Sequence, residues 1–389
     1  MKRVYLDNAA TTPLDPRVLE EMKPYFSEIY GNASSIHYMG SIAKEALESA
    51  RRSVSELMNA SPNELIFTGG ATEANNLVLK GYAFKNGKKK THIVISMIEH
   101  DCILNSAKWL EQLGFKVSYL PVNYHGIIDF TELEIMLKRG ASLISVIHAN
   151  NEIGTIQPLR EIGALCHEYD ACFHTDAAQS FGKISIDTKR MNLDFMTVNA
   201  HKIYGPKGVG ALYVGKDTTL DPLIHGGGHE FGLRSGTENI PGIVGFSKAV
   251  NLRKNEMSSE AQKLTQLRES LTRELLEVEN TYLNGHPTLR LPNISNLRFS
   301  FIEGESLVLL LNDEGIYVST GSACSSMSSE PSHVLLALGL KPEDVHGSIR
   351  ISLGKHNTKE DIEYALEVIL RSVKKLRRIS PLSENPLNK

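Results

Sequence analysis

The sequence alternates short apolar runs with segments of helical spacing from residue 64 to residue 214. Apolar runs of this length are typical of buried strands, and the segments between them repeat with the 3.6-residue period of helices. A chain in which strands and helices alternate folds into an α/β layer around a mostly parallel sheet. The predicted strands are residues 64–67, 92–96, 116–120, 143–148, 171–174, 194–198 and 209–214.

Polar and ionisable residues follow soon after most of these predicted strands. In an open parallel sheet, a ligand binds beyond the carboxyl ends of the strands. Residues that follow different strands are therefore expected to meet in one site. The residues in such positions are Thr72, His100, Asn151, Asp176, Gln179 and Lys202.

Lys202 stands at the end of a predicted strand, beside His201 and before a glycine-rich turn. Burial would lower the pKa of its ammonium group, and the free amine can form a Schiff base with an aldehyde such as pyridoxal phosphate. That cofactor also needs a phosphate site, an acid beside its pyridine nitrogen and a group packed on its ring. The turn at residues 70–72 before a helix, Asp176 and His100 match these needs in that order.

Each of these features also has an ordinary structural interpretation. A strand-end lysine can point into water, and a glycine turn can simply join a strand to a helix. Asp176 can cap a helix, and His100 can lie on the surface. A metal site is a further alternative, from the cluster Cys166, His167, Cys172 and His174. The spacing of that cluster matches no familiar zinc pattern, and adjacent Cys and His side chains usually point apart.

The composition is that of a globular protein in a reducing compartment. The chain has 389 residues, which suggests two domains, and a formal net charge of -3, which gives no general attraction to nucleic acid or membranes. Its first residues lack the apolar region of a signal peptide, and no apolar run is long enough to span a bilayer. We therefore expect a cytoplasmic protein with no nucleic-acid or membrane partner.

The four cysteines are scattered and do not suggest a disulfide framework. Cys102, Cys166 and Cys172 fall in predicted regular elements, so we expect them to be buried core residues. Cys324 instead lies in a loop rich in serine and glycine at residues 319–332, which has little to bury.

The pattern changes at about residue 256. Leu264, Leu267, Leu271 and Leu275 mark a long amphipathic helix. Short strands are predicted at residues 295–299, 317–320 and 348–353, and Thr358 is expected to cap a final helix.

Eight motifs resemble, in order, those of cysteine desulfurases of the NifS/IscS type, in the class-V branch of fold-type-I pyridoxal-phosphate enzymes. They span nearly the whole chain and read Y-L-D-N-A-A-T-T-P, G-G-A-T-E-A-N-N, I-E-H, N-N-E-I-G, H-T-D-A-A-Q, H-K-I-Y-G-P-K-G, R-S-G-T-E-N and G-S-A-C-S-S. The resemblance implies a large cofactor-binding domain at residues 15–255, with a mostly parallel seven-stranded sheet flanked by helices. A smaller α+β domain would comprise residues 1–14 and 256–389 and carry the active-site cysteine loop.

The resemblance also implies the chemical roles of matching residues. Lys202 would hold pyridoxal phosphate covalently and move the substrate proton, and His100 would stack on the ring and assist proton transfer. Asp176 would pair with the pyridinium nitrogen, and Gln179 would hydrogen-bond the phenolic oxygen. Cys324 would take the sulfur of L-cysteine as a persulfide and leave L-alanine.

The remaining implied roles concern the phosphate, the substrate and the partners. Asn151, which would also contact the cofactor, and Arg350 would bind the substrate carboxylate, Arg350 as a two-pronged fork. Thr237 would reach the phosphate of the other subunit in a homodimer. An iron–sulfur scaffold protein or another acceptor would take the sulfur for cluster assembly; no intrinsic metal is expected, although Cys324 could ligate a cluster transiently. The residues expected to hold the phosphate are Ala71, Thr72, Asn199 and His201.

Three residues depart from the family pattern. Asn199 stands in place of a usual serine beside the phosphate, Ala33 in place of a proline, and Phe231 in place of a frequent arginine on the dimer side. Two other reactions with the same cofactor stay open, selenocysteine lyase and transamination, although transamination needs no thiol such as Cys324. A scaffold-binding protein without catalysis is a third possibility, against which the intact cofactor-binding residues argue.

Overall fold

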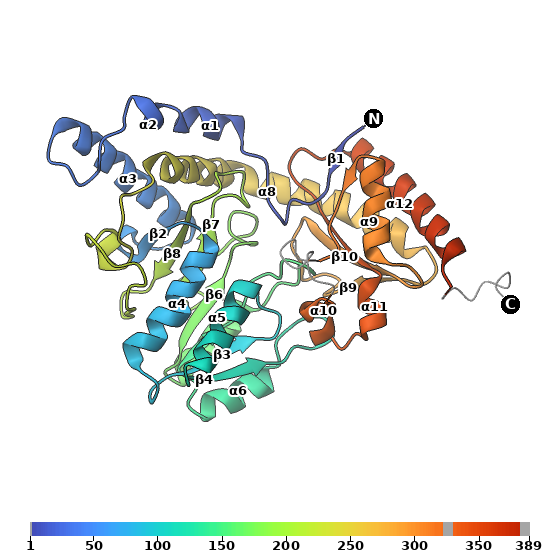
Figure 1. Ribbon diagram of the computed structural model, residues 1–389, viewed down its shortest axis with the longest axis horizontal. Helices are drawn as coiled ribbons and strands as arrows, with labels where there is room; N and C mark the ends of the chain where they lie inside the picture. The colour runs from blue at the N-terminus through green and yellow to red at the C-terminus, as the bar shows by residue number, and fades with distance from the viewer. Residues whose placement is uncertain (1, 322–329, 382–389) are drawn as a thin grey trace.

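The computed structural model of the protein describes residues 2–321 and 330–381. A seven-stranded sheet forms the middle layer of its larger part, beside a smaller part that contains α9 (Gly304–Asp313) and α12 (Lys359–Ile379) (Figure 1). The strands β4, β3, β5, β6 and β7 pair in parallel, whereas β8 runs antiparallel to both β7 and β2. The mostly parallel seven-stranded sheet is therefore confirmed. Across the sheet the order is β2 (Leu65–Thr68), β8 (Gly210–Val214), β7 (Phe195–Asn199), β6 (Cys172–Asp176), β5 (Leu143–Ser145), β3 (His92–Ser96) and β4 (Lys116–Leu120).

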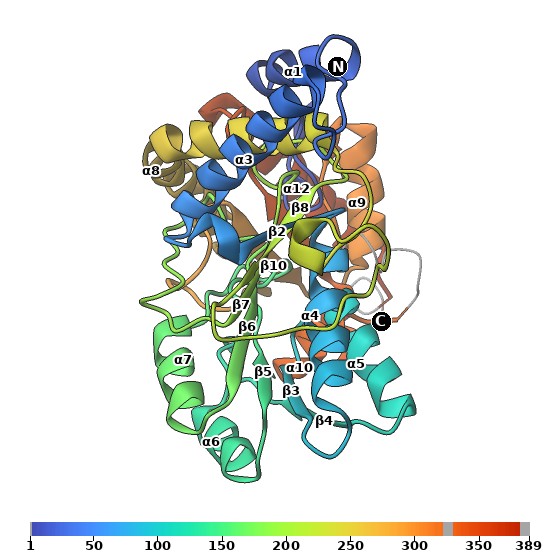
Figure 2. The same cartoon turned by 90° about the vertical axis from the view of Figure 1, so that its left-hand side faces the viewer.

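Different helices cover the two faces of this sheet (Figure 2). Successive strand residues point to opposite faces, so Leu65 and Phe67 belong to one core cluster and Ile66 to another. The face of Leu65 packs against α1 (Pro16–Met22), α3 (Tyr38–Leu57), α6 (Phe130–Lys138), α7 (Leu159–Glu168) and the first part of α8 (Ile240–Leu276). The face of Ile66 packs against α4 (Ala71–Asn86) and α5 (Asp101–Gln112).

A second hydrophobic core contains residues from both ends of the chain. The later part of α8 reaches it with Leu264, Leu271 and Leu275. An antiparallel sheet of β12 (Ser348–Ser352), β10 (Ile294–Phe299) and β9 (Thr281–Asn284) contributes, as does the parallel pair β1 (Val4–Tyr5) and β11 (Ile316–Tyr317). The helices α9 (Gly304–Asp313) and α12 (Lys359–Ile379) also pack into it. The expected domain boundary at residues 255–256 falls inside α8 and stays a prediction.

Short elements complete the described chain. The segment that begins at Pro16 is divided into α1 and α2 (Pro24–Ser27), because Pro24 has no N–H to continue the first helix. Single turns form η1 (Pro62–Glu64) and η2 (Glu230–Gly232), and two short helices are α10 (His333–Ala337) and α11 (Pro342–His346). Thr358 caps α12, as expected, in a reciprocal capping box with Asp361.

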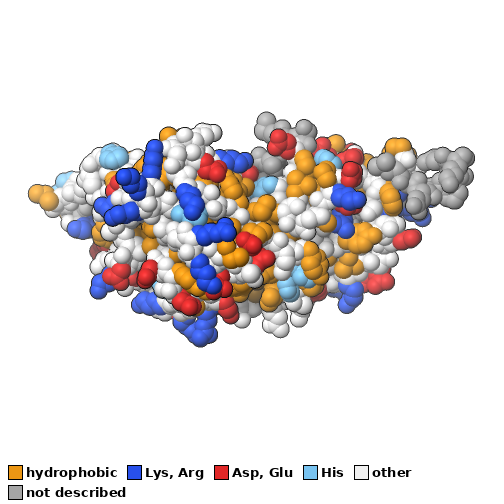
Figure 3. All heavy atoms as spheres, turned by 90° about the horizontal axis from the view of Figure 1, so that it is seen from below, with side chains coloured by type: hydrophobic (Ala, Val, Ile, Leu, Met, Phe, Trp, Pro, Cys, Tyr) orange, Lys and Arg blue, Asp and Glu red, His pale blue; other side chains and the backbone are white. Residues whose placement is uncertain are grey.

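The surface carries charges of both signs. On the face in Figure 3, basic and acidic side chains are interspersed with apolar ones. Among the described residues, no helix combines the length and the apolar character that crossing a membrane requires.

Candidate active site

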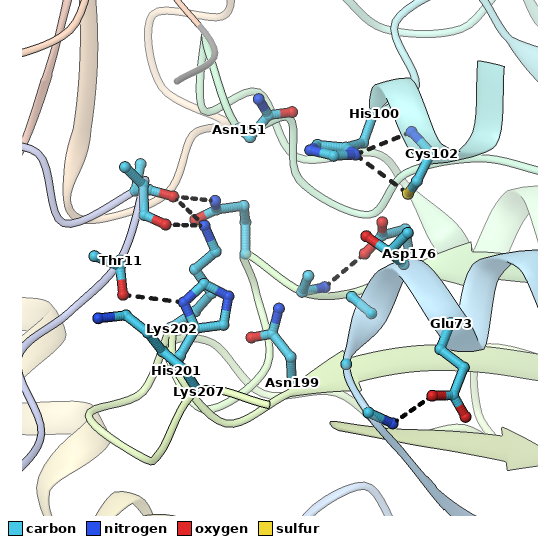
Figure 4. A pocket seen from close by; sticks show the side chains of 18 of the residues that line it. Thr11, Glu73, His100, Cys102, Asn151, Asp176, Asn199, His201, Lys202 and Lys207 are labelled. Carbon is cyan, nitrogen blue, oxygen red and sulfur yellow. Dashed lines mark hydrogen bonds between the residues drawn. The ribbon is translucent and has the colours of Figure 1, made fainter. Parts of the chain in front are cut away.

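A cavity of about 830 Å³ lies beyond the carboxyl ends of β2, β6 and β7 (Figure 4). In Figure 4, His100 and Asp176 lie across this space from Lys202 and His201. The residues of its wall that the sequence singled out are Ala71, Thr72, His100, Asn151, Asp176, Gln179, Asn199, His201, Lys202 and Arg350.

The first turn of α4 reaches the cavity behind a glycine turn. Gly70 has a φ of 148°, a conformation that favours glycine, and a Cβ on Gly210 would lie 2.9 Å from the Gly70 Cα. The Glu73 carboxylate holds the turn by accepting a hydrogen bond from the Gly69 N–H at 2.8 Å. The free N–H groups and the dipole of this 16-residue helix favour an anion beside Ala71 and Thr72.

Asp176 ends β6 and presents a buried carboxylate to the cavity. Its Oδ2 accepts from the Asn75 amide at 2.7 Å, and its Oδ1 accepts from the Ala178 N–H at 2.8 Å. A carboxylate held in this way at the cavity wall can pair with a cation in the cavity.

His100 caps the start of α5 with its ring. Its Nδ1 accepts from the Cys102 N–H at 3.2 Å, so the proton of the neutral ring belongs on Nε2. The Cys102 sulfur also lies 3.2 Å from Nδ1 and lines the cavity.

Cys166 is buried as expected, whereas Cys102 and Cys172 are only half-buried, which corrects that expectation. Cys102 is accessible because it sits in the first turn of a helix that starts at the cavity.

Lys202 contacts the N-terminal arm of the chain. Its Nζ donates to the carbonyl oxygens of Ala9 and of Ala10, the latter at 2.7 Å. The neighbouring His201 ring meets the Thr11 hydroxyl at 3.1 Å. Burial, reinforced by the charges of Lys202 and other lysines, lowers the pKa of His201 to about 4, so its ring is neutral at neutral pH.

Arg350 lies in β12, and only 1% of its surface is exposed. Some of the N–H donors of its guanidinium have partners within the protein. It donates to the Asn151 carbonyl oxygen at 2.9 Å and to the Asp7 carboxylate at 2.8 Å. Its Nε has no hydrogen-bond partner among the described residues. The remaining donors of the fork can bind a carboxylate in the cavity.

Two amides in the wall of the cavity also lack partners. The Oδ1 atoms of Asn151 and Asn199 are buried and make no hydrogen bond within the described part of the chain. Unpaired buried polar groups of this kind are costly, and a polar ligand in the cavity would satisfy them.

Sequence reasoning missed other residues of this region. Thr11, Cys102 and Lys207 line the cavity without having been assigned a role, although all three lie in or beside the quoted motifs. Glu99, which is buried, and Lys183, which is half-buried, are ionisable groups beside residues of its wall. Only the proximity of Glu99 to His100 in the I-E-H motif could have drawn attention to them.

One predicted residue, Thr237, does not line the cavity, because it is exposed on the loop before α8. The predicted sulfur acceptor, Cys324, lies outside the described residues. The chain that leads to Cys324 passes the cavity wall, because Ser319 pairs with Arg350 as an isolated bridge.

The remaining departures and the metal alternative lie away from the cavity. Ala33 is buried, and Phe231 is 57% exposed with its ring under the Arg51 guanidinium. Within residues 2–321 and 330–381, no three His, Cys, Asp or Glu side chains are grouped so as to hold a metal ion. His174 is instead buried between Ser145 and Thr197.

Comparisons with known proteins give a consistent family assignment. Residues 4–365 match the family model described as aminotransferase class-V. A curated relative, the cysteine desulfurase IscS of Methanosarcina thermophila, is 50% identical over 98% of this chain and 95% of its own. The cysteine desulfurase IscS 1 of Archaeoglobus fulgidus is 49% identical over 97% of this chain and 99% of its own.

Solved structures are similar as well. A NifS-like protein superposes with a TM-score of 0.91 at 40% identity, covering 96% of this chain and all of the other. A structure described as SspA in complex with cysteine has a TM-score of 0.82, also at 40% identity, covering 91% of this chain and 100% of its own.

Proposed function

We infer the reaction from the family to which this chain belongs, the class-V aminotransferases, and within it from the cysteine desulfurases. The protein is an enzyme that uses pyridoxal phosphate to convert L-cysteine to L-alanine. The sulfur leaves with an acceptor, and the IscS relatives support iron–sulfur cluster assembly as its use.

One observation carries the assignment of roles to residues. A single cavity combines an amine on Lys202, a helix N-terminus at Ala71, a carboxylate on Asp176 and unpaired amides. These groups match the aldehyde, the phosphate and the ring nitrogen of pyridoxal phosphate, so the residues present fit that cofactor.

We propose that the cofactor is held from both ends of the cavity. Ala71 and Thr72 would bind the phosphate with the first turn of α4, together with Asn199 and the neutral His201. Asp176 would pair with the ring nitrogen at the other end. The chemistry that the bound cofactor supplies is withdrawal of electrons from the substrate carbon.

The ring and the substrate would be oriented by groups with defined donors. The Gln179 amide would donate to the phenolic oxygen, and His100 would lie on the ring with its Nε2 proton available for transfer. Arg350 and Asn151 would bind the substrate carboxylate, with the Arg350 fork fixed by Asp7. Lys202 would hold the cofactor and move the proton of the substrate at its Nζ.

The sulfur step would take place at Cys324. Its thiolate would attack the sulfur of L-cysteine, so that a sulfur–sulfur bond forms as the carbon–sulfur bond breaks. The electron pair of the broken bond stays on the carbon, which takes up a proton to give alanine. The persulfide on Cys324 would then pass its sulfur to a scaffold protein or another acceptor, and a transient cluster could bind there.

We also propose that the enzyme works as a homodimer in the cytoplasm. Thr237 is exposed and could reach the phosphate of a second subunit. Exposed apolar side chains in the segment from residue 26 to residue 38 supply surface that a partner could cover: Phe26, Tyr30, Ile36 and Tyr38.

The test is an absorption spectrum of the purified protein, followed by addition of L-cysteine and assays of alanine and sulfide. Borohydride reduction and peptide mass spectrometry should place the cofactor on Lys202. Attachment to Lys207, which also lines the cavity, would contradict the proposed role. The same assay with L-selenocysteine tests the alternative reaction. A selenocysteine lyase would form alanine from L-selenocysteine but not from L-cysteine.

The test of Cys324 needs a control, because Cys102 is another thiol at the cavity. Cys324→Ala should bind cofactor and L-cysteine but release alanine only at background rate, whereas Cys102→Ala should keep turnover and carry the persulfide on Cys324. A persulfide on Cys102, or turnover at the wild-type rate in Cys324→Ala, would refute the sulfur step.

A further inference from the structure

Lys183 lies behind Gln179 and binds it from the side away from the N-terminal arm. The Lys183 Nζ donates to the Gln179 backbone oxygen at 2.9 Å and to its side-chain Oε1 at 3.3 Å. The two residues are four positions apart in the turns that follow β6. The mechanism proposed above gives Lys183 no role.

These contacts determine which way the Gln179 amide is turned. A lysine side chain has only donors, so the atom of Gln179 that faces Lys183 must be the carbonyl oxygen. The Nε2 then faces the other way, where it donates to the Ala9 oxygen at 2.8 Å. That same oxygen accepts from Lys202 Nζ, so Lys183, Gln179, Ala9 and Lys202 form one hydrogen-bonded series.

We propose that Lys183 is a positioning residue that fixes the Gln179 amide so that it offers the cavity a donor and never an acceptor. The inference rests on the proposed function, because the group that needs this donor is the phenolic oxygen of pyridoxal phosphate. If the amide could turn over, its Oε1 would face a negatively charged oxygen, which is repulsive. A fixed donor stabilises the charged phenolic oxygen. It thereby lowers the proton affinity of the nitrogen through which Lys202 would hold the cofactor.

The charges around Lys183 affect its own pKa and that of His201. Burial, helped by the charges of Lys202 and Arg253 and opposed by that of Glu260, lowers the pKa of Lys183 to about 7. The charge of Lys183 in turn contributes to the low pKa of His201. When Lys183 loses its proton, its two remaining N–H groups are still enough for its hydrogen bonds to the backbone oxygen and the Oε1 of Gln179.

The experiment compares the absorption of the cofactor-loaded protein as a function of pH in a set of variants. Lys183→Met removes the donors and the charge and should raise the apparent pKa of the absorption change by about one unit or more, as expected for loss of a hydrogen bond to a charged group. Lys183→Arg, which keeps donors and charge, should restore the wild-type value. Lys189→Met, at an exposed lysine nearby, is the matched control and should change nothing.

A double-mutant cycle separates positioning from simple charge. If Lys183 acts through Gln179, Lys183→Met should add little to the shift already caused by Gln179→Leu. A full additional shift in that background would overturn the proposal, because it would show that the charge acts alone. Should Lys183→Met fail to fold, Lys183→Leu, which also lacks donors and charge, takes its place in the same cycle.

The outcomes also separate this inference from the proposed function. A wild-type protein that takes up no cofactor overturns the proposed function and this inference with it. A wild-type protein that binds cofactor and forms alanine, beside a Lys183→Met variant that titrates like Lys189→Met, overturns this inference alone.

Discussion

Replacing Glu99 with glutamine tests the electrostatics behind the candidate site. The Glu99 Oε1 accepts from the Ser96 hydroxyl at 2.7 Å and from the Ile147 N–H at 2.5 Å, while Oε2 has no partner among the described residues. Burial, opposed by the hydrogen bond from Ser96 and helped by the charge of Asp176, raises the pKa of Glu99 from 4.5 to about 8. Glu99 is therefore a neutral acid in the folded protein at neutral pH.

The sign of the effect follows from proton linkage. Below pH 4.5 both states hold the proton and Glu99 costs nothing. Between pH 4.5 and 8 the unfolded chain ionises while the folded one does not, so stability falls as pH rises. At about 1.4 kcal/mol for each pKa unit, the full cost above pH 8 is about 5 kcal/mol, of which about 4 kcal/mol develops between pH 5 and pH 9.

Glu99→Gln removes this dependence on pH. The new amide group brings donors with no acceptor nearby, which costs about 1–3 kcal/mol at every pH. The variant should therefore be less stable than the wild type at pH 5 and more stable at pH 9.

Urea unfolding followed by circular dichroism at several pH values measures the difference between the two proteins. The buried histidines His148 and His174 and the amine of Lys183 also make stability depend on pH, but they are common to both proteins and cancel. Glu367→Gln, at an exposed position of α12, is the matched control. A difference for Glu99→Gln that stays constant from pH 5 to pH 9 would refute the reasoning, because Glu99 would then ionise in the folded state.

Three further substitutions test the site and its support. Asp176→Asn should keep the fold and the cofactor but lose most turnover, because an amide does not stabilise a protonated ring nitrogen; near-normal kcat would exclude that role. Glu230→Gln should lower the free energy of unfolding by about 3–5 kcal/mol, because it leaves Arg51 buried without the carboxylate now 2.7 Å away, and a loss below about 1 kcal/mol in urea unfolding would contradict this. Arg350→Lys should raise KM for L-cysteine more than it changes kcat, since lysine lacks the fork, and an unchanged KM would argue against carboxylate binding.

The strands of the large sheet were predictable because both of their faces are buried. Such strands appear in a sequence as continuous apolar runs, and the predicted residues 92–96 coincide with β3, which is buried throughout. The predicted residues 116–120 also coincide with β4, although this strand lies at the edge of the sheet and only Leu120 is buried. The predicted strand 143–148 is shorter in the structure, where β5 ends at Ser145. The helix α6 was missed although Asp129 caps it by accepting from the N–H groups of Thr131 and Glu132.

The second core was harder to predict because its elements are short and depend on distant partners. The strand β9 has four residues and pairs only with β10, and β1 has two residues that pair with β11 more than 300 positions away. A run as short as T-Y-L-N carries no period of its own, so its conformation depends on the sheet that it joins. The same holds for α9, whose apolar residues are nearly continuous.

The residues of the candidate site differ in what makes them recognisable. Asp176 and Asn199 end strands, so topology alone brings them to one edge of the sheet. Glu99 accepts a hydrogen bond from Ile147, 48 positions further on, and Lys183 owes its low pKa to burial and to the charge of Lys202. Strand order therefore predicts which side chains can touch a ligand, whereas the groups that adjust their charge and orientation are defined only by tertiary packing. For this reason Lys183 and Glu99, rather than further residues of the wall, are where the structure adds most to the chemistry expected from the sequence.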